Sequence, residues 1–286
     1  MEEVLLEDGY IRANKIILGD RVSFGKGVKI NVRGTFEVGS DSRIGDRFEV
    51  NAENVKIGKF FFNGPTDSRG MVIGGGGANF PFANLTIGDR VVCHTGHINL
   101  ARPVTIGNDV GLSHDVDIIT HGFWASVFDG YPNVFAEVNI GNNVIVGWKT
   151  VIMAGVNICD NVVIGSHSTV VKSLDVEKGI YGGTPAKLIK TVQPLSLKEK
   201  QSKMNSILLE FHQLIEFYDV EPFLTSFNME EPARVYIDNL TIYTETMMCE
   251  GEHTDLTDAF RDFLRRYGIR VFVEGRPFKF NLKRKS

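Results

Sequence analysis

An aliphatic residue recurs at every sixth position over much of the first two thirds of the chain. The longest unbroken series is Ile140, Val146, Ile152, Ile158, Ile164 and Val170. Shorter series with the same period begin at Leu18, Val38, Ile87 and Leu100. A period of six is neither the 3.6 residues of an amphipathic helix nor the two of an ordinary strand. The pattern predicts short strands separated by turns and stacked in parallel, with the aliphatic side chains forming one internal column.

The period of six ends near residue 193, and the composition changes at the same place. Of the 30 glycines, 27 lie in residues 1–190 and 3 in residues 191–286. Glycine accumulates where tight turns are frequent, so only the first part has the composition of a turn-rich repeat. We therefore predict a β-rich repeat domain over residues 1–193 and a separate α+β unit over residues 194–286.

The C-terminal unit carries ordinary helix and strand patterns. Ser196 and Glu199 have the spacing of a capping box, and apolar residues follow at helical spacing up to Tyr218. A second, short amphipathic helix is expected over residues 255–267, with Gly268 as its stop. The expected strands of this unit are 234–237, 240–246 and 269–273. No motif in this unit indicates a chemical role.

Charge and cysteine content exclude several function classes. With 31 basic and 35 acidic residues the formal charge is −4, so no basic field favours nucleic acid or an anionic membrane. No apolar run approaches the ~18 residues of a spanning helix, and the N-terminus lacks the pattern of a cleaved signal. Three scattered cysteines form no C-x-x-C pair, which fits a reducing compartment. These features predict a cytoplasmic protein without a nucleic-acid partner or membrane insertion.

Three segments of the repeat carry recognisable motifs: Val-Thr-Ile-Gly-Asn-Asp-Val at 104–110, Val-Asn-Ile-Gly-Asn-Asn-Val at 138–144, and Tyr-Gly-Gly-Thr-Pro-Ala-Lys-Leu-Ile-Lys at 181–190. These segments resemble hexapeptide-repeat acyltransferases, most closely the galactoside, maltose and xenobiotic O-acetyltransferase group. The resemblance is strong over about residues 87–190, weaker over 11–62 and absent after about 195. It implies a left-handed parallel β-helix with three hexads in each coil. It also implies a homotrimer with active sites between subunits and acetyl-CoA bound in the groove between adjacent helices.

Two interruptions of the repeat are expected to form loops. The first spans about residues 62–86 and contains Gly74-Gly-Gly-Gly77, Phe80 and Phe82. No Lys-Ser/Thr follows these glycines, so a flexible loop is favoured over a phosphate-binding loop. The second spans about residues 121–138 and contains the aromatic residues Phe123, Trp124, Phe128, Tyr131 and Phe135. Such a loop either packs on a neighbouring subunit or lines a ligand site, with Trp124 as a substrate-contacting residue.

His121 is the candidate general base. Transfer of an acyl group from a thioester to a hydroxyl needs a base, and imidazole titrates near working pH. His121 ends the run Ile-Ile-Thr-His at the root of the aromatic loop, and the resemblance matches it to the active-site histidine of the family. The alternative is a structural histidine that satisfies a carbonyl group at a turn. His114 is a second candidate for the base.

Residues 93–99 are candidates for contact with the acceptor. His94 and His97 lie in Cys93-His-Thr-Gly-His97, a spacing that differs from the local histidine pair of the γ-class carbonic anhydrases. No metal is therefore expected. In the family resembled, this stretch supplies an acceptor-contacting asparagine. Here Cys93 takes that position and Asn99 lies further along, so His94 or His97 is expected to replace the missing contact.

The resemblance also assigns four residues to the coenzyme. Trp148 stands where the family has a small residue beside the pantetheine arm, and its backbone amide would serve the thioester carbonyl. Ser166 would add a backbone contact. Lys172 and Lys187 would meet the phosphates of CoA as mobile point charges. Simple solvation is the alternative for both lysines.

Together these features predict an acetyl-CoA-dependent O-acetyltransferase that acts on a hydroxyl of a sugar or glycan precursor. His121 would remove the hydroxyl proton, and the alkoxide would attack the thioester directly. One alternative is an N-acetyltransferase that acts on an amino sugar or nucleotide sugar. A noncatalytic β-helix scaffold is the alternative from another class, and a zinc hydratase ranks third. Retained acetyl-CoA binding would separate an enzyme from a scaffold.

Overall fold

The computed structural model describes residues 1–64, 70–75 and 81–285, which divide into two compact units, Met1–Val192 and Gln193–Ser286. The first unit is a parallel β-helix of three sheets, and the second is an α+β unit, as the sequence predicts. Among the residues described, no helix is both long enough and apolar enough to span a bilayer.

The strands of the first unit follow one another around three sheets, so that most strands pair with the third strand along the chain. The first sheet contains β1 (Glu2–Leu6), β2 (Gly9–Ala13), β5 (Val28–Val32), β8 (Glu49–Ala52), β11 (Met71–Gly74), β14 (Gly96–Asn99), β17 (Val116–Ile118), β22 (Val151–Ile152) and β25 (Thr169–Val170). The second sheet contains β3 (Lys15–Leu18), β6 (Thr35–Val38), β9 (Asn54–Ile57), β12 (Asn84–Ile87), β15 (Val104–Ile106), β20 (Val138–Ile140) and β23 (Asn157–Ile158).

The third sheet contains β4 (Ser23–Phe24), β7 (Arg43–Ile44), β10 (Phe62–Asn63), β13 (Val92–Cys93), β16 (Gly111–Leu112), β21 (Ile145–Val146), β24 (Val163–Ile164), β26 (Gly179–Gly182) and β27 (Lys187–Thr191). Successive coils pair in parallel, while β1 and β27 add an antiparallel strand at either end. Three strands to a coil explain the period of six, because each coil consumes about three hexads.

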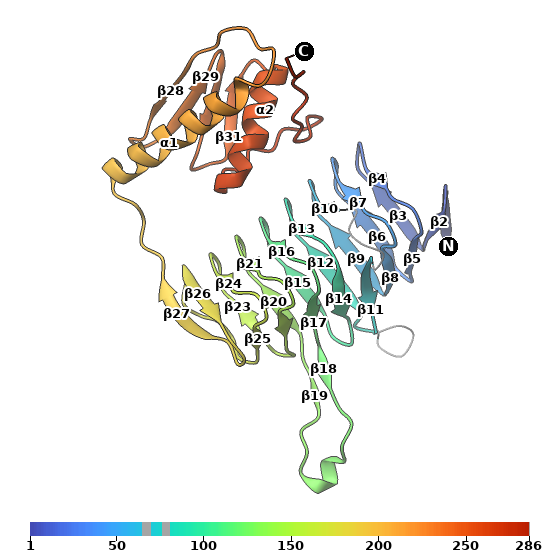
Figure 1. Cartoon of the computed structure of the whole chain (residues 1–286). Helices are drawn as coiled ribbons and strands as arrows, with labels where there is room; N and C mark the ends of the chain where they lie inside the picture. Colours follow the sequence, from blue (N-terminus) through green and yellow to red (C-terminus); the bar gives the residue numbers. More distant parts are fainter. Residues whose placement is uncertain (65–69, 76–80, 286) are drawn as a thin grey trace. The chain divides into compact units, whose positions relative to one another are not determined.

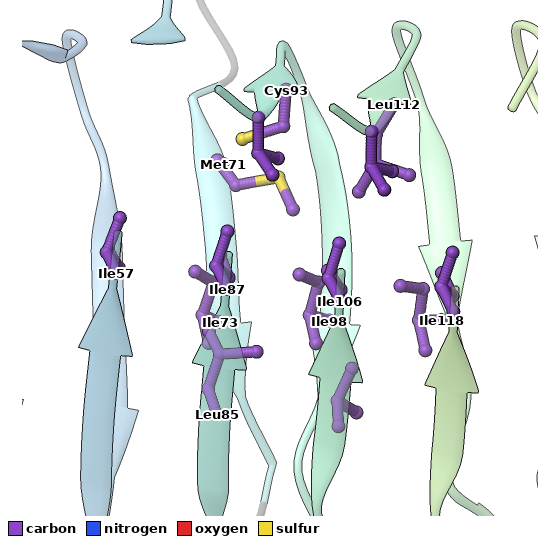
Figure 2. Close-up of a cluster of buried hydrophobic side chains, with 14 of the residues drawn as sticks. Ile57, Met71, Ile73, Leu85, Ile87, Cys93, Ile98, Ile106, Leu112 and Ile118 are labelled. Carbon is purple, nitrogen blue, oxygen red and sulfur yellow. The ribbon is translucent and has the colours of Figure 1, made fainter. Parts of the chain in front are cut away.

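The aliphatic residues of the hexads form one continuous core. Ile106, Leu112, Ile118, Ile140, Val146 and Ile152 are at most 2% exposed. Figure 2 shows Ile73, Ile98 and Ile118 at matching positions on β11, β14 and β17, which pair in that register. Burial of each such side chain contributes roughly 1.5–3 kcal/mol, so the stack is stable although its strands are short.

Glycine follows the aliphatic residue of several hexads because consecutive coils approach closely there. A Cβ on Gly107 would lie 2.7 Å from the carbonyl carbon of Gly141 in the next coil. No real side chain tolerates that distance, so the glycine spacing reflects contact between coils and not flexibility.

The interruption expected over residues 62–86 is shorter in the structure. Within it, β11 pairs in parallel with both β8 and β14 and is an ordinary part of the first sheet. The alternation of Met71 and Ile73 into the core explains why this segment forms a strand. Residues 65–69 and 76–80 lie outside the described residues, and with them Gly76, Gly77 and Phe80.

The second interruption is an antiparallel arm between β17 and β20. It consists of β18 (His121–Gly122), the 3₁₀ turn η1 (Val127–Asp129) and β19 (Val134–Phe135). Figure 1 shows this arm extending away from the stacked coils. The aromatic segment is therefore an ordered projection and not part of a coil.

The C-terminal unit contains two helices and a four-stranded antiparallel sheet. The elements are α1 (Leu197–Ile215), β28 (Thr225–Asn228), β29 (Arg234–Ile237), β30 (Leu240–Tyr243), β31 (Met248–Gly251), α2 (Asp255–Leu264) and the 3₁₀ turn η2 (Arg265–Tyr267). The capping box of Ser196 and Glu199 is confirmed, and Gly268 ends the second helix in a left-handed conformation (φ 78°). Strands β28 and β31 were not expected.

The strand expected over residues 269–273 is wrong. The side chain of Arg261, which is fully buried, takes the carbonyl group that a strand partner would use. Its Nε and Nη2 atoms donate to the Val271 oxygen at 3.2 and 3.0 Å. Val271 is still buried, and Ile269 and Val273 are half-buried against the core of this unit, but the segment is irregular chain.

Candidate active site

His121 lies where the aromatic arm leaves the β-helix. It is the first residue of β18 and pairs with Phe135 of β19. Its ring packs against Phe123 and Phe135, with centroid distances of 5.2 and 5.8 Å. The amide of Ala136 donates to the Thr120 carbonyl at 3.1 Å, so both strands of the arm are tied to the same corner of the coil. The histidine is therefore fixed at the root of the arm.

The side chain of Asn99 holds the imidazole of His121 in one orientation. Asn99 Oδ1 lies 2.8 Å from His121 Nδ1. The same atom accepts hydrogen bonds from the amide of Ala101 at 3.2 Å and from the hydroxyl of Thr120 at 2.6 Å. A backbone amide is always a donor, so this atom of Asn99 is the oxygen and His121 Nδ1 must carry the proton. In the neutral imidazole, Nε2 is then the basic nitrogen.

This contact changes the role expected for Asn99. The sequence suggested that Asn99 touches the acceptor, whereas its side chain is buried and bonded to the histidine. Thr120, which is fully buried in the same network, was missed. A sequence signal for it exists, because the inward position of Ile118 makes Thr120 point inward as well.

Replacement of Asn99 by alanine is expected to lower kcat about tenfold to a hundredfold with little change in KM. Loss of the side-chain oxygen removes the acceptor of the His121 Nδ1 proton and of the Ala101 amide, at a cost of about 1–3 kcal/mol, and frees the other tautomer. Steady-state kinetics of N99A measures this split. Asn31→Ala, at an exposed position of the same sheet, is the control. An increase in KM alone would assign Asn99 to the acceptor instead.

His97 occupies the outer face of the first sheet beside Asp117. The two residues are paired across β14 and β17. Burial lowers the pKa of His97, the charge of Asp117 opposes this effect, and the charge of His121 adds to it. A groove of about 480 Å³ runs along this face and is lined by Gly70, Val72, Thr95, Gly96, Asp115, Asp117 and Lys149. This groove offers the hydrogen-bonding groups of Thr95, two aspartates and Lys149 to a polar ligand.

Four of the predicted residues form a row at the end of the first sheet opposite to His121, with one residue in each successive coil. His94 and His114 stack in parallel with ring centroids 4.4 Å apart, and Trp148 and Ser166 follow in the next two coils. Trp148 Nε1 donates to Asp115 at 3.4 Å, and Lys149 lies over the indole ring. Half of the Trp148 surface remains exposed.

The stacked histidines predict a pH-dependent stability. Burial and the charge of His114 lower the pKa of His94 from 6.5, so the unfolded chain binds more protons than the folded one just below that value. Stability therefore falls as the pH decreases through 6.5 towards the lowered pKa. Urea unfolding from pH 8 to pH 5 measures the slope, which His94→Gln should reduce. A slope that is unchanged in H94Q would contradict this origin.

Three other predicted residues have contrasting environments. Cys93 is 2% exposed, and burial raises the pKa of its thiol to about 12, so it does not reach the surface to meet an acceptor. Cys93 occupies the position of a hexad that is normally aliphatic, so its burial could be predicted from the sequence. Lys172 is exposed beyond β25, and Lys187 is exposed at the start of β27.

His121 and Trp148 do not meet within one chain. Trp148 is level with His114 in the neighbouring coil, since the Lys149 amide bonds to the His114 carbonyl. His121 lies beyond the far end of β17, which begins after His114, so the two residues are at opposite ends of the strands of the first sheet. Trp124, expected to touch substrate, is 98% exposed on the arm. In the described part of the chain, no three His, Cys, Asp or Glu residues are grouped to hold a metal.

Solved structures of acetyltransferases are similar to this chain. A hexapeptide-repeat acetyltransferase from Vibrio cholerae O1 biovar eltor, complexed with acetyl coenzyme A, is 17% identical, with 55% of this chain and 71% of that chain covered and a TM-score of 0.37. A galactoside acetyltransferase in complex with coenzyme A is 23% identical, with coverages of 51% and 66% and a TM-score of 0.39. The polySia-specific acetyltransferase NeuO is 21% identical, with coverages of 72% and 99% and a TM-score of 0.43.

These neighbours are hexapeptide-repeat or sugar-modifying acetyltransferases. No family model and no curated protein sequence matches the chain. Because the identities are 17–23%, the activity of this chain has to be inferred from its own residues.

Proposed function

We propose that the protein is an O-acetyltransferase that moves the acetyl group of acetyl-CoA to a hydroxyl of a sugar or glycan precursor. The observation that carries this proposal is the imidazole of His121, whose Nδ1 is bonded to Asn99 while Nε2 is left as the base. A tautomer fixed in this way is what proton abstraction from a hydroxyl requires, because an alcohol is a poor nucleophile until it loses its proton.

The proposed reaction proceeds by direct attack. His121 Nε2 takes the hydroxyl proton while the oxygen attacks the thioester carbonyl carbon, which gives a tetrahedral oxyanion. The oxyanion collapses, the C–S bond breaks, and the CoA thiolate takes the proton from the imidazolium. The Asn99 oxygen stabilises the transient imidazolium because it accepts from Nδ1–H in both protonation states. Phe123 and Phe135 cover the ring and limit the access of water.

The placement of His121 and Trp148 at opposite ends of the first-sheet strands supports a homotrimer with shared sites. If Trp148 and Ser166 bind the thioester and pantetheine, as the family resemblance implies, the thioester lies at the other end of the strands from His121 of the same chain. A neighbouring copy is then required to complete the site. The exposed Trp124 and Phe128 of the arm, both 98% exposed, are suited to pack on that copy. Lys172 and Lys187 would meet the phosphates of CoA from the surface.

We place the reaction in the cytoplasm, where acetyl-CoA is available and where Cys93, Cys159 and Cys249 remain free thiols. The acceptor class rests on the groove lined by Asp115, Asp117 and Lys149, which presents polar groups typical of sugar recognition.

Purified protein is expected to release free CoA thiol from acetyl-CoA only when a hydroxylated sugar or glycan is present. A colorimetric thiol assay over a panel of sugars and amino sugars, with mass spectrometry of the product, measures the reaction and distinguishes an ester from an amide. Sedimentation in the same buffer should give three times the monomer mass. A protein that does not bind acetyl-CoA would be a scaffold, and a product acetylated only on nitrogen would favour the N-acetyltransferase.

A further inference from the structure

Arg102 lies beside the candidate active site with its guanidinium between two aromatic rings. Its Cζ atom is 5.2 Å from the centre of the Phe82 ring and 5.1 Å from that of Phe135. Phe135 belongs to the returning strand of the arm, whereas Phe82 lies just before β12. Arg102 itself sits at the corner between β14 and β15. The cation therefore lies where the arm and the segment before β12 meet.

The charge of Arg102 has no carboxylate partner among the residues that the structure describes. One guanidinium N–H donates to the Ala101 carbonyl at 2.8 Å. Four other arginines of the β-helix each pair with an acidic residue, namely Arg12, Arg21, Arg33 and Arg90. An arginine has five N–H donors in a planar fork. Most of the hydrogen-bonding capacity of Arg102 is therefore available to a ligand.

The position of Arg102 is coupled to that of the base. Its backbone amide donates to Thr120 Oγ1 at 3.2 Å, and that hydroxyl donates to Asn99 Oδ1, the atom that orients His121. The side chains of Arg102 and His121 also both pack on Phe135. The guanidinium carbon of Arg102 lies 5.1 Å from the centre of the Phe135 ring, and the imidazole centre of His121 lies 5.8 Å from it. The guanidinium and the imidazole are thus no further apart than the sum of those two distances, a span that one sugar ring with its substituents covers.

We propose that Arg102 binds an anionic group of the acceptor, a carboxylate or a phosphate, and so selects acidic sugars over neutral ones. The inference rests on the proposed function, because it names the substrate class of the same site. A guanidinium fork recognises both anions with two parallel hydrogen bonds. The flanking rings keep the cation partly desolvated, which strengthens its interaction with an anion, and they hold it in place before the acceptor arrives.

The test uses acceptors that share one sugar ring and differ at carbon 6: glucuronic acid and its neutral amide, glucose 6-phosphate and glucose, and neutral and acidic oligosaccharides built in the same way. For the wild-type protein, kcat/KM is expected to favour an anionic member over its neutral partner by about tenfold to a hundredfold. Preference for the uronic acid or for the phosphate ester identifies the anion. In Arg102→Gln this ratio should fall to about one, and Arg102→Lys should retain part of it because the charge remains.

A variant of a neighbouring residue separates recognition from structural support. Phe82→Ala removes one of the rings that hold the cation but keeps the charge, so the preference for the anionic acceptor should weaken and still exceed one. If Arg102 only ties the two segments together, R102Q lowers turnover of neutral and anionic acceptors by the same factor, and the inference is wrong. Equal use of both acceptors by the wild-type protein also overturns it, while the transferase remains established. Absence of turnover on every acceptor would instead contradict the proposed function.

Discussion

Replacement of His121 by alanine is expected to lower acceptor-dependent release of CoA by a factor on the order of 10² to 10⁴. The variant loses the nitrogen that takes the hydroxyl proton, while the Asn99 and Thr120 network that shapes the corner remains in place. Binding of acetyl-CoA should be little changed, because the residues assigned to the coenzyme lie at the other corner of the sheet. Thiol release and calorimetric titration with acetyl-CoA measure the two quantities separately.

The control for this variant is His212→Gln, a histidine of α1 that bonds to Thr225 within the C-terminal unit. Its activity should equal that of the wild type. A rate in H121A within tenfold of the wild type would exclude His121 as the base and direct attention to His97 or His114. A loss of acetyl-CoA binding in H121A would show that the substitution disturbs the groove and does not only remove a base.

Replacement of Arg261 by alanine is expected to destabilise the C-terminal unit by about 3–5 kcal/mol. The guanidinium is fully buried, and it donates to the carbonyl groups of Val271 and Arg276 and to Asp258 at 2.7 Å. In the variant, the carbonyl oxygens of Val271 and Arg276 lose these donors, and the Asp258 carboxylate loses its ion pair with Arg261. Urea unfolding of the full chain measures the change in stability. Hydrogen exchange of the amides in residues 193–286 shows whether the change is confined to this unit.

Arg265→Ala is the matched control, since Arg265 lies on the same helical surface and pairs with Asp262, but its side chain is 46% exposed. An exposed ion pair contributes about 0–1 kcal/mol, so R265A should unfold close to the wild type. If R261A and R265A unfold alike, the buried hydrogen bonds do not stabilise the segment after α2. That result would leave the absence of the expected strand at 269–273 unexplained.

Features that depend on neighbouring residues were predictable from the sequence. The series Ile140 to Val170 predicted the coils because each hexad buries its own aliphatic side chain, and the structure buries all six. The capping box at Ser196 was predictable for the same reason, since its hydrogen bonds join residues three positions apart. The position of His121 at the start of the aromatic arm was also readable, because the end of a hexad series marks the point where a loop leaves.

Contacts between coils were not predictable in this way. Asn99 meets His121 across 22 residues, and the two coils differ in length at this corner, since Cys93 to Ile98 spans five residues whereas the paired step from Leu112 to Ile118 spans six, so no fixed spacing connects the pair. Arg102 is brought between Phe82 and Phe135 by two interruptions whose lengths are independent of the repeat. Likewise, Arg261 captures the carbonyl of Val271 only once α2 has packed on the segment beyond it.

By itself the sequence determined the repeat, the two-part organisation and the identity of the histidine at the arm, because local spacing encodes which side chains are buried. The tertiary structure alone decided which nitrogen of that histidine is basic, which cation lies beside it, and that His121 and Trp148 belong to different corners. Those properties arise from side chains that are distant in the chain and meet only when the coils are stacked.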